Sequence, residues 1–187
     1  MSSTVVQSSN FDTSNITFSQ VKTLDGVGAR QCYLNYGGRS LIFQTASMSV
    51  PYGMNTFEKE GAKPKYSVDL SFRGYEDASN KKVRSFYEAM SNLDKYMIEQ
   101  GVKNSQAWFK VKHPREVVEA FYTPCVRVAK DANGNLKQFP PTVKINLKQR
   151  KDTDVFDVQC YDDQKRPYEN TPVEELLVKG AQITCLI

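Results

Sequence analysis

One aromatic residue and two lysines occupy every second position of residues 107–112 in this chain of 187 residues. If this segment is a strand, Trp108, Lys110 and Lys112 share one face, because successive side chains of a strand point to opposite sides. An aromatic ring stacks on unpaired bases and ammonium groups attract phosphates, so the pattern suits a single-stranded nucleic acid. Burial of Trp108 in the core is the alternative interpretation.

A second basic stripe follows residues 141–148. Alternation places Val143 inward and Lys144 and Lys148 outward, and the run continues into two more cations. A solvated strand face is the ordinary interpretation of such a stripe. Other cations lie near aromatic residues, and the candidate nucleic-acid contacts are Trp108, Lys110, Lys112, Lys144, Lys148, Arg150, Lys151, Lys65, Phe72, Arg73, Tyr75 and Phe139.

Residue patterns typical of enzymes are missing from the sequence. The glycines Gly26 and Gly28 fail the dinucleotide-binding fingerprint at its third glycine, and no Gly-Lys-Ser or Gly-Lys-Thr run occurs. The one histidine, His113, is followed by Pro114, so nucleophilic catalysis would depend on a single loop residue. Acidic residues in hairpin loops are more often solvated than bound to a metal ion, and the four cysteines lie far apart in the sequence. We therefore predict no metal, no cofactor and no catalytic residue.

The composition is that of a folded protein with a small excess of positive charge. Hydrophobic residues make up 40% and charged residues 25%, and the formal net charge of +4 permits a polyanionic partner without requiring one. No stretch approaches the roughly 18 apolar residues of a membrane helix, and the Ser-rich start lacks the features of a secretory signal. These features predict an intracellular protein.

Short strands and one long helix would position the candidate contacts. Residues 65–72 alternate apolar and polar side chains, which predicts a strand with one buried face. The helix is expected to begin after an N-cap at Ser79 or Asn80 and to end at Gly101. Its apolar stripe is Val83, Phe86, Met90, Leu93 and Met97. Further strands are expected near residues 16–21, 40–47, 107–112, 121–128, 141–148, 155–161 and 182–187, and a short helix after a capping box at residues 171–174.

These elements predict a mainly β fold with one long helix, a β-rich α+β protein arranged as a small barrel or sandwich. A flexible segment is expected over residues 1–15 and a single domain over residues 16–187. Because the chain stops within the apolar run 182–187, we expect that it is truncated at the C-terminus.

Three short runs resemble a known family. Residues 49–55 (Ser-Val-Pro-Tyr-Gly-Met-Asn), 66–72 (Tyr-Ser-Val-Asp-Leu-Ser-Phe) and 139–144 (Phe-Pro-Pro-Thr-Val-Lys) resemble single-stranded DNA-binding proteins of large nucleocytoplasmic DNA viruses. That family is similar to the OB-fold single-stranded DNA-binding protein of short-tailed phages. The resemblance covers most of the chain after about residue 40. It implies a five-stranded OB-fold-like barrel with an inserted helix.

The resemblance also implies sequence-tolerant binding of single-stranded DNA in viral DNA replication, recombination or repair. DNA polymerase or helicase would be partners, a homodimer is one expected state, and the location would be the cytoplasm or nucleus of an infected host cell. Proteins of the phage type end in an acidic tail, which this sequence lacks. The alternative function is a viral structural protein, a capsid or scaffold component whose aromatic residues fill protein interfaces. A hydrolase or transferase is a third hypothesis, which would depend on His113.

Overall fold

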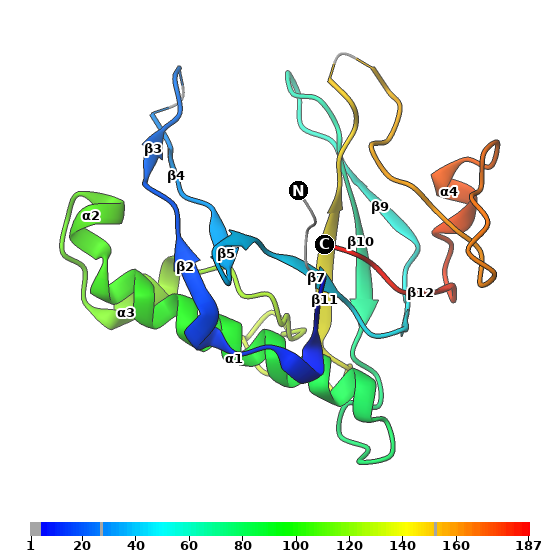
Figure 1. Cartoon of the computed structure of the whole chain (residues 1–187), viewed down its shortest axis with the longest axis horizontal. Coiled ribbons are helices and arrows are strands. Elements are labelled where there is room, and N and C mark those ends of the chain that lie inside the picture. The colour runs from blue at the N-terminus through cyan, green and yellow to red at the C-terminus, as the bar shows by residue number, and fades with distance from the viewer. Residues whose placement is uncertain (1–4, 27, 152) are drawn as a thin grey trace. The chain divides into compact units, whose positions relative to one another are not determined.

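The computed structural model describes residues 5–26, 28–151 and 153–187 (Figure 1). The chain divides into two compact units. Unit 1 comprises Met1–Ala46, Tyr75–Val126 and Cys185–Ile187, and unit 2 comprises Ser47–Gly74 and Arg127–Thr184. The single domain predicted over residues 16–187 therefore contains two units, which are described separately.

Unit 1 combines short strands with three helices in its described part. The strands β1 and β7 pair in parallel, β2, β5 and β6 form an antiparallel sheet, and β3 and β4 form a two-stranded ribbon. The elements are β1 (Val5–Gln7), 3-10 turns at Ser8–Asn10 and Thr13–Asn15, β2 (Ile16–Phe18), β3 (Lys22–Thr23), β4 (Arg30–Gln31), β5 (Leu34–Tyr36), β6 (Arg39–Ser40), β7 (Ile42–Gln44), α1 (Lys81–Lys103), α2 (Ser105–Phe109) and α3 (Arg115–Phe121).

Residues 1–4 of the segment expected to be flexible lie outside the described residues, and the flexibility of residues 1–15 stays a prediction. Residues 5–15 form β1 and the two 3-10 turns. Val6 pairs with Phe43 of β7 and is buried. The burial of Val6 beside β7 contributes to the packing of unit 1.

Helix α1 carries the predicted apolar stripe. Val83, Phe86, Met90 and Leu93 are buried, and the ring of Phe86 lies 5.6 Å from that of Phe43. The helix begins after Asn80, as predicted. The apolar spacing of 3 and 4 residues thus identified the face that packs into unit 1.

The predicted stop at Gly101 is wrong, because α1 continues to Lys103. Gly101 is a buried helical residue, and a Cβ built there would lie 2.8 Å from Cγ1 of Val118 in α3. This position therefore takes glycine because the two helices approach closely.

We expect Gly101→Ala to lower the free energy of unfolding by about 1–3 kcal/mol, the usual cost of overpacking a core. Without the contact, alanine would raise helix stability by about 1 kcal/mol. Val118→Ala removes the clashing methyl groups. In a chain that already carries Val118→Ala, Gly101→Ala should therefore lower the free energy of unfolding by less than it does in the parent chain. Urea denaturation measures these differences, and a Gly101→Ala chain as stable as the parent would refute the close approach.

The strands predicted at 107–112 and 121–128 are also wrong. Residues 105–109 form α2, and Phe121 ends α3. Such short alternating runs do not separate strand from helix, and packing decided the outcome. After α3 the backbone N–H groups of Cys125 and Val126 bond the carboxylate of Asp94 rather than a neighbouring strand.

Unit 2 is built on an open antiparallel sheet. The strand order is β11-β10-β8-β12, and β9 also pairs with β10. The elements are β8 (Met48–Ser49), β9 (Met54–Phe57), β10 (Lys65–Ser71), β11 (Thr142–Leu147), α4 (Val173–Leu176) and β12 (Gln182–Ile183). Over the described residues of both units, helices and strands include about equal numbers of residues, so the fold is mixed α+β. The described pairings do not close the predicted five-stranded OB barrel, which stays a prediction.

The predicted strands at 65–72 and 141–148 are confirmed as β10 and β11, which pair over six residues. Val68, Leu70 and Val143 are buried on one face of the pair, as the alternation indicated. At the tight turn of residues 131–135, the Asp131 carboxylate accepts hydrogen bonds from the backbone N–H groups of Asn133 and Asn135.

Two predictions for the later part of unit 2 need correction. Residues 155–161 form no continuous strand, and only Phe156 and Tyr161 make isolated bridges there. The ring of Phe156 also packs edge-on against that of Tyr66, with centroids 5.0 Å apart. The predicted capping box also fails, because Pro172 is the N-cap of α4 and makes no side-chain cap.

Candidate nucleic-acid interface

The pairing of β9, β10 and β11 brings a set of polar side chains to one face of the sheet of unit 2. Lys65 lies opposite Phe57, Ser67 lies opposite both Asn55 and Asn146, and Asp69 lies opposite Lys144. Directly opposed residues project from the same face of an antiparallel pair. We call this set the polar face: Asn55, Phe57, Lys65, Ser67, Asp69, Lys144 and Asn146.

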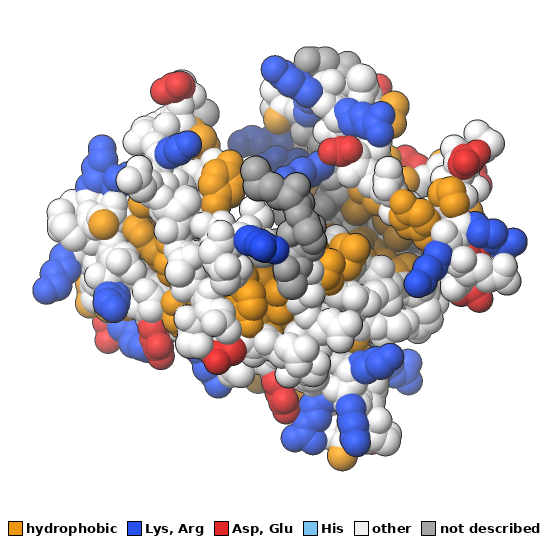
Figure 2. Space-filling model, in the orientation of Figure 1, with side chains coloured by type: hydrophobic (Ala, Val, Ile, Leu, Met, Phe, Trp, Pro, Cys, Tyr) orange, Lys and Arg blue, Asp and Glu red, His pale blue; other side chains and the backbone are white. Residues whose placement is uncertain are grey.

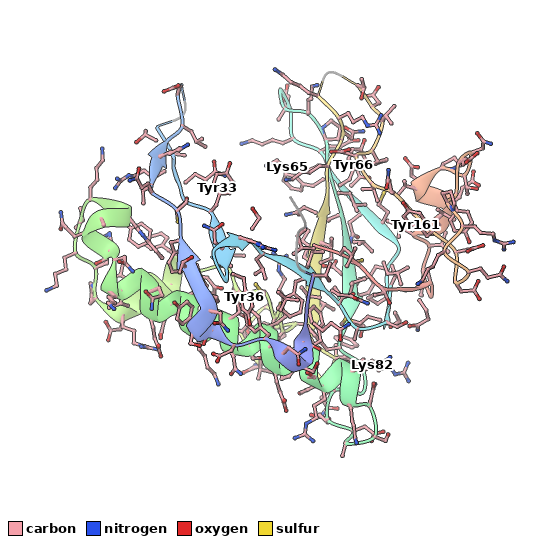
Figure 3. The ribbon with its side chains drawn as sticks, in the orientation of Figure 1. Tyr33, Tyr36, Lys65, Tyr66, Lys82 and Tyr161 are labelled. Atoms are coloured by element: carbon pink, nitrogen blue, oxygen red, sulfur yellow. The ribbon has the colours of Figure 1, made fainter. Side chains whose placement is uncertain are left out.

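Phe57 is the aromatic residue of the polar face. Its side chain is 61% exposed, and the strand pairing holds it opposite Lys65, which is also exposed. An aromatic ring with this exposure is available for stacking, and the adjacent ammonium group adds a positive charge. Figure 3 shows Lys65 next to Tyr66 at the start of β10.

The centre of the polar face is held by short side chains and one hydrogen bond. Ser67 is buried between its neighbours on β9 and β11. The amide of Asn55 donates a hydrogen bond of 3.0 Å to Oδ2 of Asp69, and Lys144 lies across from that carboxylate. Asp69 is thus engaged within the face, with Lys144 directly opposite it on β11 and Lys65 four residues before it on β10.

The opposite face of the same strands belongs to the core. Val68 is 1% and Leu70 0% exposed, and both pair with apolar residues of β11. This burial fixes the register, because a slip of one residue would turn the lysines inward. The core therefore determines which side chains the polar face presents.

Positive charge continues beyond the end of β11. The register that pairs Tyr66 with Leu147 brings Lys148 to the level of Lys65. Lys148 and Lys151 are exposed, and Nε of Arg150 lies 3.7 Å from a carboxylate oxygen of Asp157. That ion pair is open to solvent and contributes little to stability.

Trp108 does not lie in the predicted stripe. It belongs to α2 in unit 1, is half-buried, and packs edge-on against Phe18 with ring centroids 4.9 Å apart. The guanidinium of Arg30 donates hydrogen bonds to the carbonyl oxygens of Ala107 and Trp108 at 2.6 and 3.1 Å. Packing within unit 1 therefore accounts for Trp108, and Lys110 and Lys112 lie in the exposed loop that follows.

The remaining predicted contacts differ in their burial and in the unit to which they belong. Phe72 is 0% exposed, which contradicts its predicted role in stacking, since its alternating position belongs to the buried face. Arg73 is exposed in unit 2, whereas Tyr75 belongs to unit 1 and packs against Tyr87 with centroids 4.1 Å apart. Phe139 is 60% exposed in unit 2, outside the polar face.

Phe57 and Asn55 were not among the contacts predicted from the sequence. Residues 54–57 follow the turn at Pro51-Tyr52-Gly53 and are too few to show alternation by themselves. The connection to the next strand indicates their structure. Gly61 and Pro64 lie between residues 54–57 and the strand that begins at residue 65, as in the loop of a hairpin. Pairing those segments would have placed Phe57 near Lys65.

Comparisons of the chain with protein-family models, with curated proteins and with solved structures find no match. Within the described residues no cluster of three or more His, Cys, Asp or Glu side chains could hold a metal ion. The same residues include no helix long and apolar enough to cross a membrane. The geometry of the polar face therefore carries the functional argument.

Proposed function

We propose that this protein binds single-stranded DNA, with little dependence on sequence, in viral DNA replication, recombination or repair. The observation that carries the proposal is the register of β9 and β10, which sets the exposed ring of Phe57 opposite Lys65. The five strands that pair in one sheet support an OB-fold-like arrangement of unit 2 as part of the proposal.

In this proposal the strand of DNA crosses the polar face. One base stacks on Phe57, while the phosphates follow Lys65, Lys144 and Lys148. Lys144 and Lys148 are four residues apart, so their Cα atoms are separated by about 13 Å along the strand and their ammonium groups reach different phosphates. Asn146 projects between them and offers both a donor and an acceptor to bases.

Stacking on an exposed aromatic ring should make the protein bind single strands in preference to duplex DNA. The faces of paired bases are covered by their neighbours in a duplex, so a protein ring cannot stack on them without unstacking the helix. An unpaired base presents its face to any aromatic side chain, and such stacking contributes about 1–3 kcal/mol without selecting a sequence.

Fluorescence anisotropy of a labelled oligothymidine and of a matched duplex tests the proposal. We expect preferential binding of the single strand, and Phe57→Ala should weaken it roughly 5- to 150-fold. Tyr33→Ala is the matched control, because Tyr33 is an aromatic residue of unit 1 with 60% exposure against 61% for Phe57. Equal affinity for the duplex, or no loss with Phe57→Ala, would overturn the proposal.

A further inference from the structure

A second surface of unit 2 has the opposite charge from the polar face. It is a hollow of about 450 Å³ lined by parts of residues 154–161 and 167–174. The carboxylates of Asp154, Glu169 and Glu174 line it, and none of the described lining residues is Lys or Arg. The hollow therefore repels phosphate and favours a cationic occupant.

Apolar side chains line part of this hollow, beside its polar groups. The apolar side chains include Val155, Phe156, Val158, Tyr161, Tyr168 and Val173. Val155 is 56%, Tyr161 54% and Tyr168 45% exposed, and Figure 2 shows hydrophobic side chains gathered beside α4 in this region. Exposed apolar side chains around a concave site mark a surface that binds a partner.

An exposed loop of unit 1 has the matching chemistry. In Phe109-Lys110-Val111-Lys112 the apolar side chains are 47% and 54% exposed, and both lysines are exposed. We call these four residues the basic loop. Its apolar and cationic side chains alternate, so it presents two apolar groups flanked by two positive charges.

The basic loop is held in shape by its own hydrogen bonds. Lys110 has a φ of +65°, its N–H donates to the carbonyl of Gln106, and its carbonyl accepts from Nε2 of Gln106 at 3.0 Å. The backbone N–H of His113 donates to Oγ of Ser105 just after the loop. A loop that is already ordered loses little conformational freedom when it docks.

We propose that the basic loop of one copy docks into the acidic hollow of a second copy. Phe109 or Val111 packs against the apolar side chains of the hollow, while Lys110 and Lys112 face the carboxylates of Glu169 and Glu174. Because the two surfaces are different, a pair of copies keeps one free loop and one free hollow after a single contact. Such a heterologous contact extends into a ring or an open chain of copies.

This self-association does not rest on the proposed function, since it uses neither Phe57 nor the lysines of the polar face. If the chain does bind single strands, the contact between copies would make binding cooperative along the strand.

A charge-exchange experiment in the absence of nucleic acid tests the inference. One variant carries Lys110→Glu and Lys112→Glu, and the other carries Glu169→Lys and Glu174→Lys. Sedimentation velocity of the parent chain should show a mass that rises with protein concentration and falls with added salt. Each variant alone should associate at least about tenfold more weakly, because like charges then face each other.

An equimolar mixture of the two variants is the decisive sample. The glutamates of one variant's loop meet the lysines of the other's hollow, and the unchanged loop and hollow are complementary too, so the mixture should regain the association of the parent. Circular dichroism checks that each variant is folded. A parent chain that stays monomeric, or variants that associate like the parent, would overturn the inference. If the parent chain is monomeric and the variant with Lys110→Glu and Lys112→Glu loses DNA binding, the basic loop is a contact for nucleic acid instead.

Discussion

Replacing Lys65, Lys144 and Lys148 together with alanine should weaken binding of oligothymidine roughly a hundredfold at low salt. Each lysine that neutralises a phosphate of a single strand contributes about 0.7 to the slope of log affinity against log salt concentration. The slope for the triple variant should therefore be shallower by about 2. Anisotropy titrations at several salt concentrations measure both quantities.

The matched control removes the same charge from unit 1. Lys22, Lys95 and Lys103 are exposed, and their replacement with alanine also removes three charges, which takes the formal net charge from +4 to +1. If phosphate contacts on the polar face carry the binding, this control keeps most of the affinity and of the salt slope. Equal losses in both triple variants would show that overall charge, rather than the polar face, attracts the DNA.

Strong periodicity made the framework of the fold predictable from sequence. The alternation over residues 65–72 and 141–148 identified β10 and β11, and the spacing of Val83, Phe86, Met90 and Leu93 identified the buried face of α1. Both patterns extend over a whole element, and a one-residue shift would expose the core in either case. Local patterns of this length rarely have two interpretations.

Shorter runs were predicted poorly because tertiary contacts decide their structure. Residues 107–112 alternate as a strand would, yet Arg30 bonds the carbonyls of Ala107 and Trp108 and Phe18 packs on the indole ring. None of these partners is near residue 108 in the sequence. The stop predicted at Gly101 failed for a similar reason, since the glycine serves the contact with Val118.

The candidate site was predictable only in part. The lysines at 65, 144 and 148 followed from alternation, whereas Phe57 depends on the register between β9 and β10, which no single segment encodes. Phe72 was misassigned because its position on the buried face, already visible in the alternation, was outweighed by its proximity to Arg73. Burial of an aromatic residue on a core face takes precedence over a neighbouring charge.

Asp94 is a residue of α1 whose carboxylate is buried in unit 1, at 9% exposure. Its Oδ1 accepts hydrogen bonds of 2.8 Å from the hydroxyl of Tyr122 and from the backbone N–H of Cys125. Its Oδ2 accepts one of 3.0 Å from the N–H of Val126. The carboxylate therefore fixes the segment that follows α3 onto α1.

We expect Asp94→Ala to lower the free energy of unfolding by about 2–4 kcal/mol, because three donors lose a charged acceptor. Asp94→Asn should be nearly as harmful, since one end of an amide carries N–H groups that face donors. Tyr122→Phe removes one of the three bonds and should cost about 1–2 kcal/mol. Midpoints of urea denaturation give the order of the three variants.

The pH dependence provides an independent check on the same cluster. Burial, with the hydrogen bond to Asp94, raises the pKa of Tyr122 well above its ordinary value. The neutral hydroxyl is favoured in the folded state, so this contribution is complete below about pH 10 and is lost as the pH rises further. The parent chain should therefore lose stability more steeply than Tyr122→Phe in that alkaline range. An unchanged stability of Asp94→Ala, or parallel alkaline profiles, would mean that the segment after α3 is held by other contacts.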